Sequence, residues 1–343
     1  MKVKQNRILW LDSLKGYAIL LVMLSHTLYY NNVMGILYSG FMPLFFIASG
    51  YTDNKTLTWD VVIKKSKRLL IPYFFYGLMG SLFFTIISPT SIYQGGVVHE
   101  WIGLLYARFC LYPYGKADNV FFLPMEATAP LWFLPALFVG FLIYYFLKRL
   151  KLRESLLSCL YGGAILITIM LSNLVILLPW SLDIAFLVAF FLFLGNKIGN
   201  LTYTVLGVKR IAVIIVSVCI YVMLAYYNGL INLSVREFGI YRYWSIFAIV
   251  ILGLTYFIAV SGIFCIIPKR VTKLFSWIGH LSLRLMCIQM PIFCIVGKIL
   301  DLCGVSNTFL EVSVKLFVVL TVAYGMNLAI SKMQRHFSVV KYL

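Results

Sequence analysis

The stretch DSLKGYAILLVMLSH, residues 12–26, decides how this chain is to be interpreted. Most of it is apolar enough for a membrane-spanning helix, yet Asp12 and Lys15 stand near its start and His26 at its end. Ionisable groups are costly in lipid, so inside a span they are functional candidates by default. The stretch raises two questions: whether the chain lies in a membrane, and what these three residues do there.

The composition answers the first question. The chain has 343 residues, of which 62% are hydrophobic and 12% charged, and its mean hydropathy is +0.95. Soluble domains are about 45–50% apolar and about 25% charged. The sequence therefore predicts an all-α integral membrane protein in contact with lipid. The net charge of +18 does not indicate nucleic-acid binding, because the basic residues form short groups between apolar runs, as cytoplasmic loops do.

The apolar runs predict the number of spans. A membrane-spanning helix needs about 20 apolar residues, and on that basis we predict about ten transmembrane helices. They form a single domain, 1–343, with no separate soluble domain. The first is interpreted as a retained span, because charged residues interrupt it and no small-residue cleavage pattern follows. The spans are expected at 12–30, 35–52, 69–88, 130–147, 156–173, 180–198, 211–228, 242–266, 275–297 and 309–331.

The basic residues predict the orientation, because cytoplasmic loops are enriched in Lys and Arg. Of the 29 basic residues, 21 lie in the N-terminal segment, the tail and the alternate loops on their side, and five lie on the opposite side. We therefore expect both termini in the cytoplasm. The longest external connection, 89–129, is expected to lie along the outer interface or at a cavity mouth.

The cysteines give no sign of a metal site. Most of the seven lie inside apolar runs. None belongs to a CxxC pair or to a Cys/His cluster with metal-ligand spacing. We therefore predict no metal cofactor.

Helical geometry places the polar residues of the first span on one face. Eleven positions separate Lys15 from His26, which is three turns plus roughly 20° at about 100° per residue and roughly 16 Å along the axis. Asp12 precedes Lys15 by three positions, so the two can pair. One interpretation is a helix-end salt bridge with a hydrogen-bonded core histidine. The other is a functional stripe with His26 as general base. The helix alone leaves both open.

Six segments, in chain order, carry a family resemblance. They are NRILWLDSLKGYAILLVMLSH at 6–26, FMPLFFIASGY at 41–51, KKSKRLLIPYFFYG at 64–77, LWFLPALF at 131–138, LPWSLDIAFLVAFFLFLG at 178–195 and IGHLSLRLMCIQMP at 278–291. Together they resemble the membrane acyltransferase family known as acyltransferase 3. The fifth resembles a segment of its sugar O-acetylase branch, the relatives of fucose 4-O-acetylases.

The resemblance implies an activity. Members of the family pass an acyl group, usually acetyl, from cytoplasmic acetyl-CoA to a hydroxyl across the membrane. The acceptor is commonly a surface polysaccharide, such as O-antigen, capsule or exopolysaccharide, or its lipid-linked precursor. The resemblance thus implies an O-acetyltransferase of the cell inner (plasma) membrane.

The resemblance also implies roles for residues. The family's catalytic histidine matches His26, which would deprotonate the acceptor. From its position beside Lys15, Asp12 would assist by orienting Lys15 or by holding nearby charge. Lys15, Lys65 and Arg68 match basic positions and would meet the phosphates of CoA. Lys15 and Lys65 stand where the family often has arginine. Lysine keeps the positive charge but lacks the planar guanidinium group that can donate two parallel hydrogen bonds.

Four further residues are candidates, and three of them have plain structural alternatives. Arg284 would line the donor channel or extend to the interface. Asp183 would contact the acceptor or cap a helix, and Trp132 would stack on a sugar or belong to the interfacial aromatic belt. Gln289 would hydrogen-bond to a sugar or carbonyl; the family often has histidine there, and also before Met-Pro of the second span, where this chain has Phe41.

A transporter or exporter of a glycan or acylated sugar is the rival prediction. Many spans with buried charges suit one. Transporters more often show paired half-helices broken by Gly or Pro, and no clear pair is visible in the sequence. The cytoplasmic basic cluster and the stripe ending at His26 favour acyl transfer.

Overall fold

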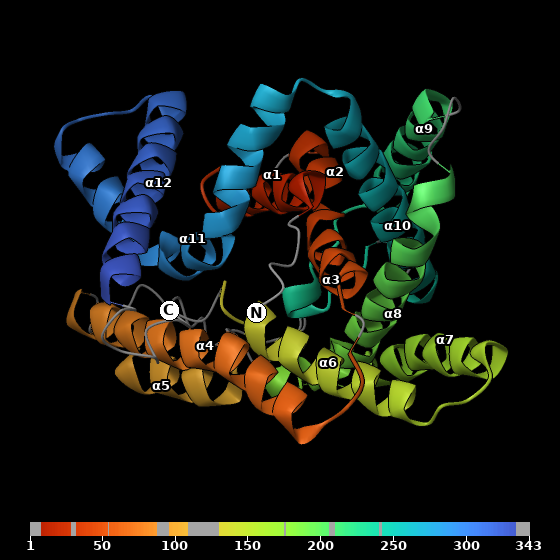
Figure 1. Ribbon diagram of the computed structural model, residues 1–343. Helices are drawn as coiled ribbons and strands as arrows, with labels where there is room; N and C mark the ends of the chain where they lie inside the picture. Colours follow the sequence, from red (N-terminus) through yellow and green to blue (C-terminus); the bar gives the residue numbers. More distant parts are fainter. Residues whose placement is uncertain are drawn as a thin grey trace.

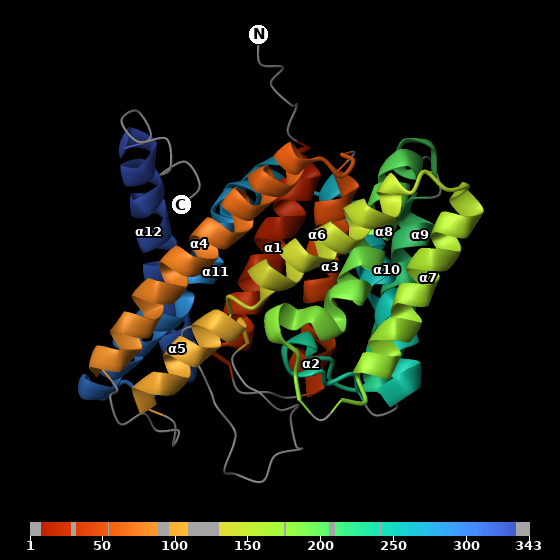
Figure 2. The ribbon, with the colours of Figure 1, turned by 90° about the horizontal axis from the view of Figure 1, so that it is seen from below.

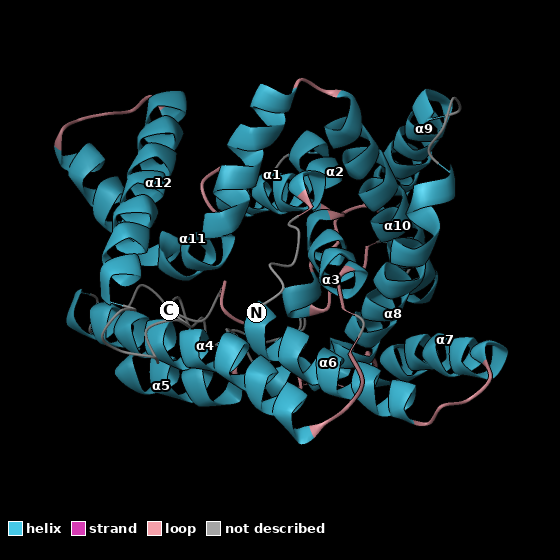
Figure 3. Ribbon diagram, viewed as in Figure 1, coloured by secondary structure: helices cyan, strands magenta, loops and turns pink. Residues whose placement is uncertain are grey.

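The computed structural model describes residues 8–28, 32–53, 55–87, 96–108, 130–174, 176–205, 210–239 and 242–333. These residues form α-helices joined by loops, together with two single-turn 3-10 helices and an isolated bridge between Asn232 and Glu237 (Figure 3). Within those ranges there is no β-strand, so the predicted all-α class is confirmed for the described part.

The helices follow the predicted apolar runs closely. They are α1 (Leu9–Ser25), α2 (Asn32–Tyr38), α3 (Phe41–Tyr51), α4 (Trp59–Ile87), α5 (Gly96–Tyr106), α6 (Phe133–Arg149), α7 (Glu154–Leu171), α8 (Leu182–Val205), α9 (Arg210–Asn228), α10 (Arg242–Ile266), α11 (Lys269–Leu302) and α12 (Thr308–Met333).

Seven of these helices are long and apolar enough to cross a membrane: α4, α7, α8, α9, α10, α11 and α12. Helices α1 and α6 have 17 residues each. The second predicted span, 35–52, is divided between α2 and α3. The chain is therefore a multi-pass helical membrane protein.

Helix α1 lies at the centre of the molecule, against α11, α3 and α10 (Figure 1). Helix α12 packs on α11 at one edge, whereas α7 and α9 lie at the other. Successive long helices alternate in direction, so α1, α4 and α11 run the same way (Figure 2). Helix α5, in the predicted external connection, packs on α4, where the Tyr73 hydroxyl donates to the Leu104 carbonyl at 2.7 Å.

Glycine allows α1 and α11 to touch backbone to backbone. A Cβ on Gly16 would lie 1.9 Å from the carbonyl oxygen of Phe275, and one on Gly279 would lie 1.9 Å from that of Asp12. The Ser13 hydroxyl donates to the Thr272 carbonyl at 2.6 Å beside this crossing. Small residues let helices approach closely in membranes, where packing rather than hydrophobicity drives association. This crossing fixes the position of α1 against α11.

A second glycine crossing joins α3 to α8. A Cβ on Gly50 would lie 2.1 Å from the Leu192 carbonyl oxygen, and one on Gly195 would lie 2.0 Å from that of Ile47. Gly50 lies in the last turn of α3, between Ser49 and Tyr51, and the contact explains why glycine is needed there. The side chain of Tyr51 then packs edge to face on Trp10 of α1, with ring centroids 5.1 Å apart.

We predict that Gly279→Ala lowers stability by about 1–3 kcal/mol, because the added methyl must push two backbones apart. Gly163→Ala in α7 is the matched control, since nothing lies within 4 Å of the added Cβ. There, alanine should be neutral or stabilising by up to about 1 kcal/mol through helix propensity. Thermal unfolding in detergent measures both. Equal midpoints for the two variants would contradict the crossing.

Candidate functional site

The polar start of α1 meets α11. The Asp12 carboxylate lies 3.9 Å from the Lys15 ammonium, as the spacing predicted, and 3.9 Å from Nε2 of His280 on α11. Lys15 is half-buried and His280 is 39% exposed. The pair predicted within one helix is therefore a cluster of three residues on two helices, and Asp12 holds it together.

His26 lies at the opposite end of α1. It is the C-cap residue, following Ser25, and it is accessible to solvent, although the surrounding protein desolvates its imidazole strongly. Between the two ends, α1 is lined by buried apolar residues such as Ile19 and Val22. Helix α1 thus separates a charged end from an accessible imidazole, the arrangement expected from the spacing of Lys15 and His26.

Arg284 extends the charged cluster along α11, one turn beyond His280. Its guanidinium donates to Oδ1 of Asn327 on α12 at 2.6 Å. Tyr76 of α4 lies within electrostatic reach of Arg284 and of the buried thiol of Cys287. Helices α1, α4, α11 and α12 therefore all contribute polar groups to this region.

Lys65 is placed against a carboxylate that sequence reasoning missed. Its ammonium lies 2.7 Å from Oδ2 of Asp53 and 3.2 Å from the ring centroid of Phe141. The Tyr145 hydroxyl donates to the same oxygen of Asp53 at 2.6 Å, and the Asn196 amide donates to the Asp53 carbonyl at 2.8 Å. Asp53 thus joins the end of α3 to α4, α6 and α8.

The surroundings of Asp53 keep it ionised. Burial alone would raise its pKa, but the charge of Lys65 and the hydrogen bonds from Lys65, Tyr145 and the Lys55 backbone outweigh burial and lower the pKa. A depressed pKa means that the pair stabilises the fold above the ordinary aspartate pKa and stops doing so as pH falls through the lowered value.

The pairing of Lys65 bears on donor binding. A phosphate could contact the Lys65 ammonium only by sharing it with Asp53 or by displacing Asp53. Arg68, one turn further along α4, has an exposed side chain. Arg68 is therefore the better placed of the two for a phosphate, and the role of Lys65 stays a prediction.

Trp132 and Gln289 lie inside the protein. Trp132 immediately precedes α6, is 3% exposed and packs edge to face on Phe133. Its ring is covered by protein, so stacking on a sugar would require rearrangement. Gln289 lies in the second half of α11 with 0% exposure. The acceptor contacts predicted for both residues remain predictions.

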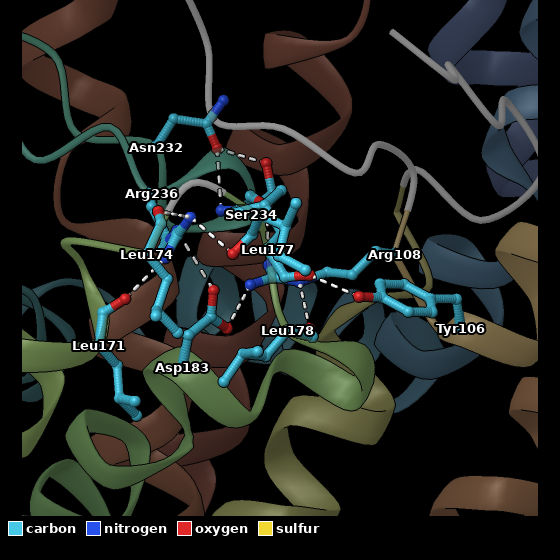
Figure 4. Close-up of polar contacts among 11 residues, drawn as sticks. Tyr106, Arg108, Leu171, Leu174, Leu177, Leu178, Asp183, Asn232, Ser234 and Arg236 are labelled. Atoms are coloured by element: carbon cyan, nitrogen blue, oxygen red, sulfur yellow. Dashed lines mark hydrogen bonds and ion pairs between the residues drawn. The ribbon is translucent and has the colours of Figure 1, made fainter. Parts of the chain in front are cut away.

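Asp183, at the start of α8, lies between two arginines that the sequence analysis did not connect with it (Figure 4). One carboxylate oxygen accepts a hydrogen bond from Arg108, and the other lies 3.3 Å from Nε of Arg236. The side chains of Asp183 and Arg108 are wholly buried, and that of Arg236 is 1% exposed. We call these three residues the arginine clamp.

The two arginines of the clamp also hydrogen-bond to backbone carbonyls in the loops that connect helices. Arg108 also donates to the carbonyls of Ser234 at 2.8 Å and Leu178 at 3.3 Å. Arg236 also donates to the carbonyls of Leu171, Leu174 and Ile176 at 2.8–3.0 Å. Each carboxylate oxygen of Asp183 therefore faces an arginine, although the one beside Arg236 accepts no hydrogen bond among the described residues, and an acceptor would compete with an arginine for either one.

The signal that could have found the clamp was visible in the sequence. Arg108 and Arg236 are among the few basic residues on the side predicted to be external, and a lone arginine there needs a partner when buried. Asp53 offered a weaker signal, as an acidic residue directly before the basic loop. Among the described residues, no group of three His, Cys, Asp or Glu side chains could hold a metal ion.

Comparison with known protein families identifies the class of protein to which this chain belongs. An acyltransferase domain model matches residues 8–328, nearly the whole chain. The chain therefore belongs to this acyltransferase family, and it is a multi-pass membrane member of it. No curated protein and no solved structure matches the chain. The predicted family is confirmed, whereas its sugar O-acetylase branch stays a prediction.

Proposed function

We propose that this protein is an inner-membrane O-acetyltransferase. It takes acetyl from cytoplasmic acetyl-CoA and transfers it to a hydroxyl of a surface polysaccharide or its lipid-linked precursor. The ten predicted spans and the basic loops support a topology with both termini in the cytoplasm. In that topology the cluster of Asp12, Lys15 and His280 faces the cytoplasm, and His26 lies toward the outer side.

The chemistry assigned to His26 is general base catalysis. A sugar hydroxyl is a poor nucleophile near pH 7, so the imidazole takes its proton as the oxygen attacks the thioester carbonyl. The carbon–sulfur bond breaks, and the proton passes to the departing thiolate of CoA. Direct transfer and a transient acyl-imidazole both fit this arrangement.

The observation that carries the proposal is the polarity of α1. One end pairs Asp12 with Lys15 and His280, and the other end presents an accessible His26, roughly 16 Å away along the helix axis. A carrier whose phosphates bind at the charged end could extend its arm toward the imidazole. Arg284, one turn beyond His280 on α11, and the exposed Arg68, on the same predicted side of the membrane, add cations, and charge-assisted hydrogen bonds from such groups to phosphate are strong.

We expect Arg68→Gln to raise the KM for acetyl-CoA about tenfold or more, because a hydrogen bond to a charged group contributes about 1.5–3 kcal/mol. The neighbouring exposed Lys67 is the matched control, and Lys67→Gln should change the KM by less than about threefold. Release of CoA thiol by the purified protein in nanodiscs, with acceptor glycan present, gives both values. An unchanged KM in Arg68→Gln would remove this residue from the donor site. Absence of acetyl-CoA turnover in the wild type would reject the proposed function.

A further inference from the structure

Gln289 has an amide that the fold does not use. The side chain is 0% exposed, and neither Oε1 nor Nε2 has a hydrogen-bond partner in the part of the chain that the structure describes. An unpaired buried polar group costs about 1–3 kcal/mol, and nearly all buried polar atoms in proteins are paired. A leucine or methionine would fill the same space at no such cost. A ligand that supplies both a donor and an acceptor would account for glutamine here.

The position of Gln289 lies on the way from the charged end of the helices toward the outer side. It follows Arg284 by five residues, so it lies about 7.5 Å further along α11. On α4, Tyr76 is within electrostatic reach of Arg284, and α4 runs in the same direction as α11 (Figure 2). Residues that follow Arg284 on α11 and Tyr76 on α4 therefore both lie further toward the outer side, beyond the level of this pair.

Helix α4 also has unused polar groups beyond that level. Ser81 follows Tyr76 by five residues, which is the same step that separates Gln289 from Arg284. The hydroxyl oxygens of Ser81 and Thr85 are buried and, like the Gln289 amide, lack a partner among the described residues. Two contacting helices thus carry unpaired polar groups deeper in the membrane than their cations.

We propose that Gln289 pairs with an amide of the pantetheine arm of the acyl-CoA donor. This inference rests on the proposed function and deepens it. A secondary amide offers one N–H and one C=O, and a glutamine amide complements both at once. With the phosphates of CoA at Lys15, Arg68 and Arg284, the arm extends past the level of Arg284, toward Gln289. Gln289 therefore recognises the pantetheine arm by hydrogen bonding to its amide, whereas the cations bind the phosphates.

Entry of the arm requires α11 to move away from a neighbour, because the Gln289 amide is enclosed in this structure. Pro291, inside α11, makes such movement easier. Proline has no backbone N–H, so the carbonyl of Cys287 lacks its helical hydrogen bond and the helix can bend there. Part of the energy gained by pairing the amide would offset this opening.

Binding of two ligands to Gln289→Leu in nanodiscs tests the inference. CoA carries the arm, whereas adenosine 3′,5′-bisphosphate carries the phosphate-bearing head without it. We expect the Kd for CoA to rise about tenfold, which corresponds to one to two neutral hydrogen bonds. The Kd for the bisphosphate should stay unchanged. The unfolding midpoint without ligand should stay equal or rise, because an unpaired amide has been removed. Gln289→Met, which keeps the length of the side chain, should behave in the same way.

Other outcomes would overturn the inference. An unchanged Kd for CoA would show that the amide does not contact the arm. An equal loss for both ligands, or a lowered midpoint, would assign Gln289 a structural role. A raised KM for the acceptor with normal CoA binding would move Gln289 to the sugar site. Wild-type protein that binds neither ligand would reject the proposed function itself, and the inference with it.

Discussion

Asp183→Asn is expected to destabilise the protein by about 3–5 kcal/mol, because breaking a buried ion pair leaves uncompensated charge inside. The arginine clamp has no route to water, since Arg108 and Arg236 are 0% and 1% exposed. Asparagine keeps the size of the side chain but removes the only negative charge of the clamp. Its amide nitrogen would also face a guanidinium, where donor meets donor.

Glu154→Gln is the matched control for that experiment. Glu154 lies 2.6 Å from the Lys197 ammonium, but it is 85% exposed, and exposed ion pairs contribute about 0–1 kcal/mol. Thermal unfolding in detergent should separate the two variants by a wide margin. Equal stability would contradict the clamp. A stable Asp183→Asn protein that has lost acyl transfer would instead favour the acceptor contact predicted from the sequence.

His26→Ala is expected to lower kcat about 100- to 10,000-fold, the usual contribution of a general base. The KM for acetyl-CoA should change little, because the proposed binding site for the donor's phosphates is at the opposite end of α1. The fold should persist, because His26 is an exposed C-cap residue. His280→Gln provides a comparison, since it removes an imidazole from the charged end, where we expect a raised KM for acetyl-CoA but a kcat close to that of the wild type. Similar losses of kcat in both variants would argue against a specific role for His26.

The sequence was sufficient to predict most of the fold, because a membrane helix is specified by a local run of apolar residues. The division of 35–52 into α2 and α3 was not predictable in this way. Gly40, which precedes α3, is packed so closely that a Cβ would lie 2.6 Å from Tyr256 and 2.8 Å from Tyr221. The contacts of Gly40 with α9 and α10, far away in sequence, are therefore a part of this break that local composition does not reveal.

The candidate site was predictable to the same extent. Local sequence alone places Asp12 and Lys15 in the first helix and His26 near its end, although α1 ends at Ser25, short of the predicted residue 30. The partners of Asp183 were not predictable, since the Arg108 contact joins residues 75 positions apart. The pairing of Lys65 with Asp53 depends on how α3 meets α4. Periodicity places residues on a face, whereas only tertiary packing decides which charges neutralise one another.

The most direct test of the central claim uses intact cells that produce the wild-type chain, His26→Ala at equal expression, or neither. Surface glycan is isolated, and its ester groups are quantified by NMR before and after mild alkali. We predict alkali-labile acetyl with the wild type, and its absence in the other two samples. Equal acetylation with the wild type and His26→Ala would contradict a catalytic His26. Unesterified glycan whose surface amount depends on the protein would contradict acyl transfer and favour export.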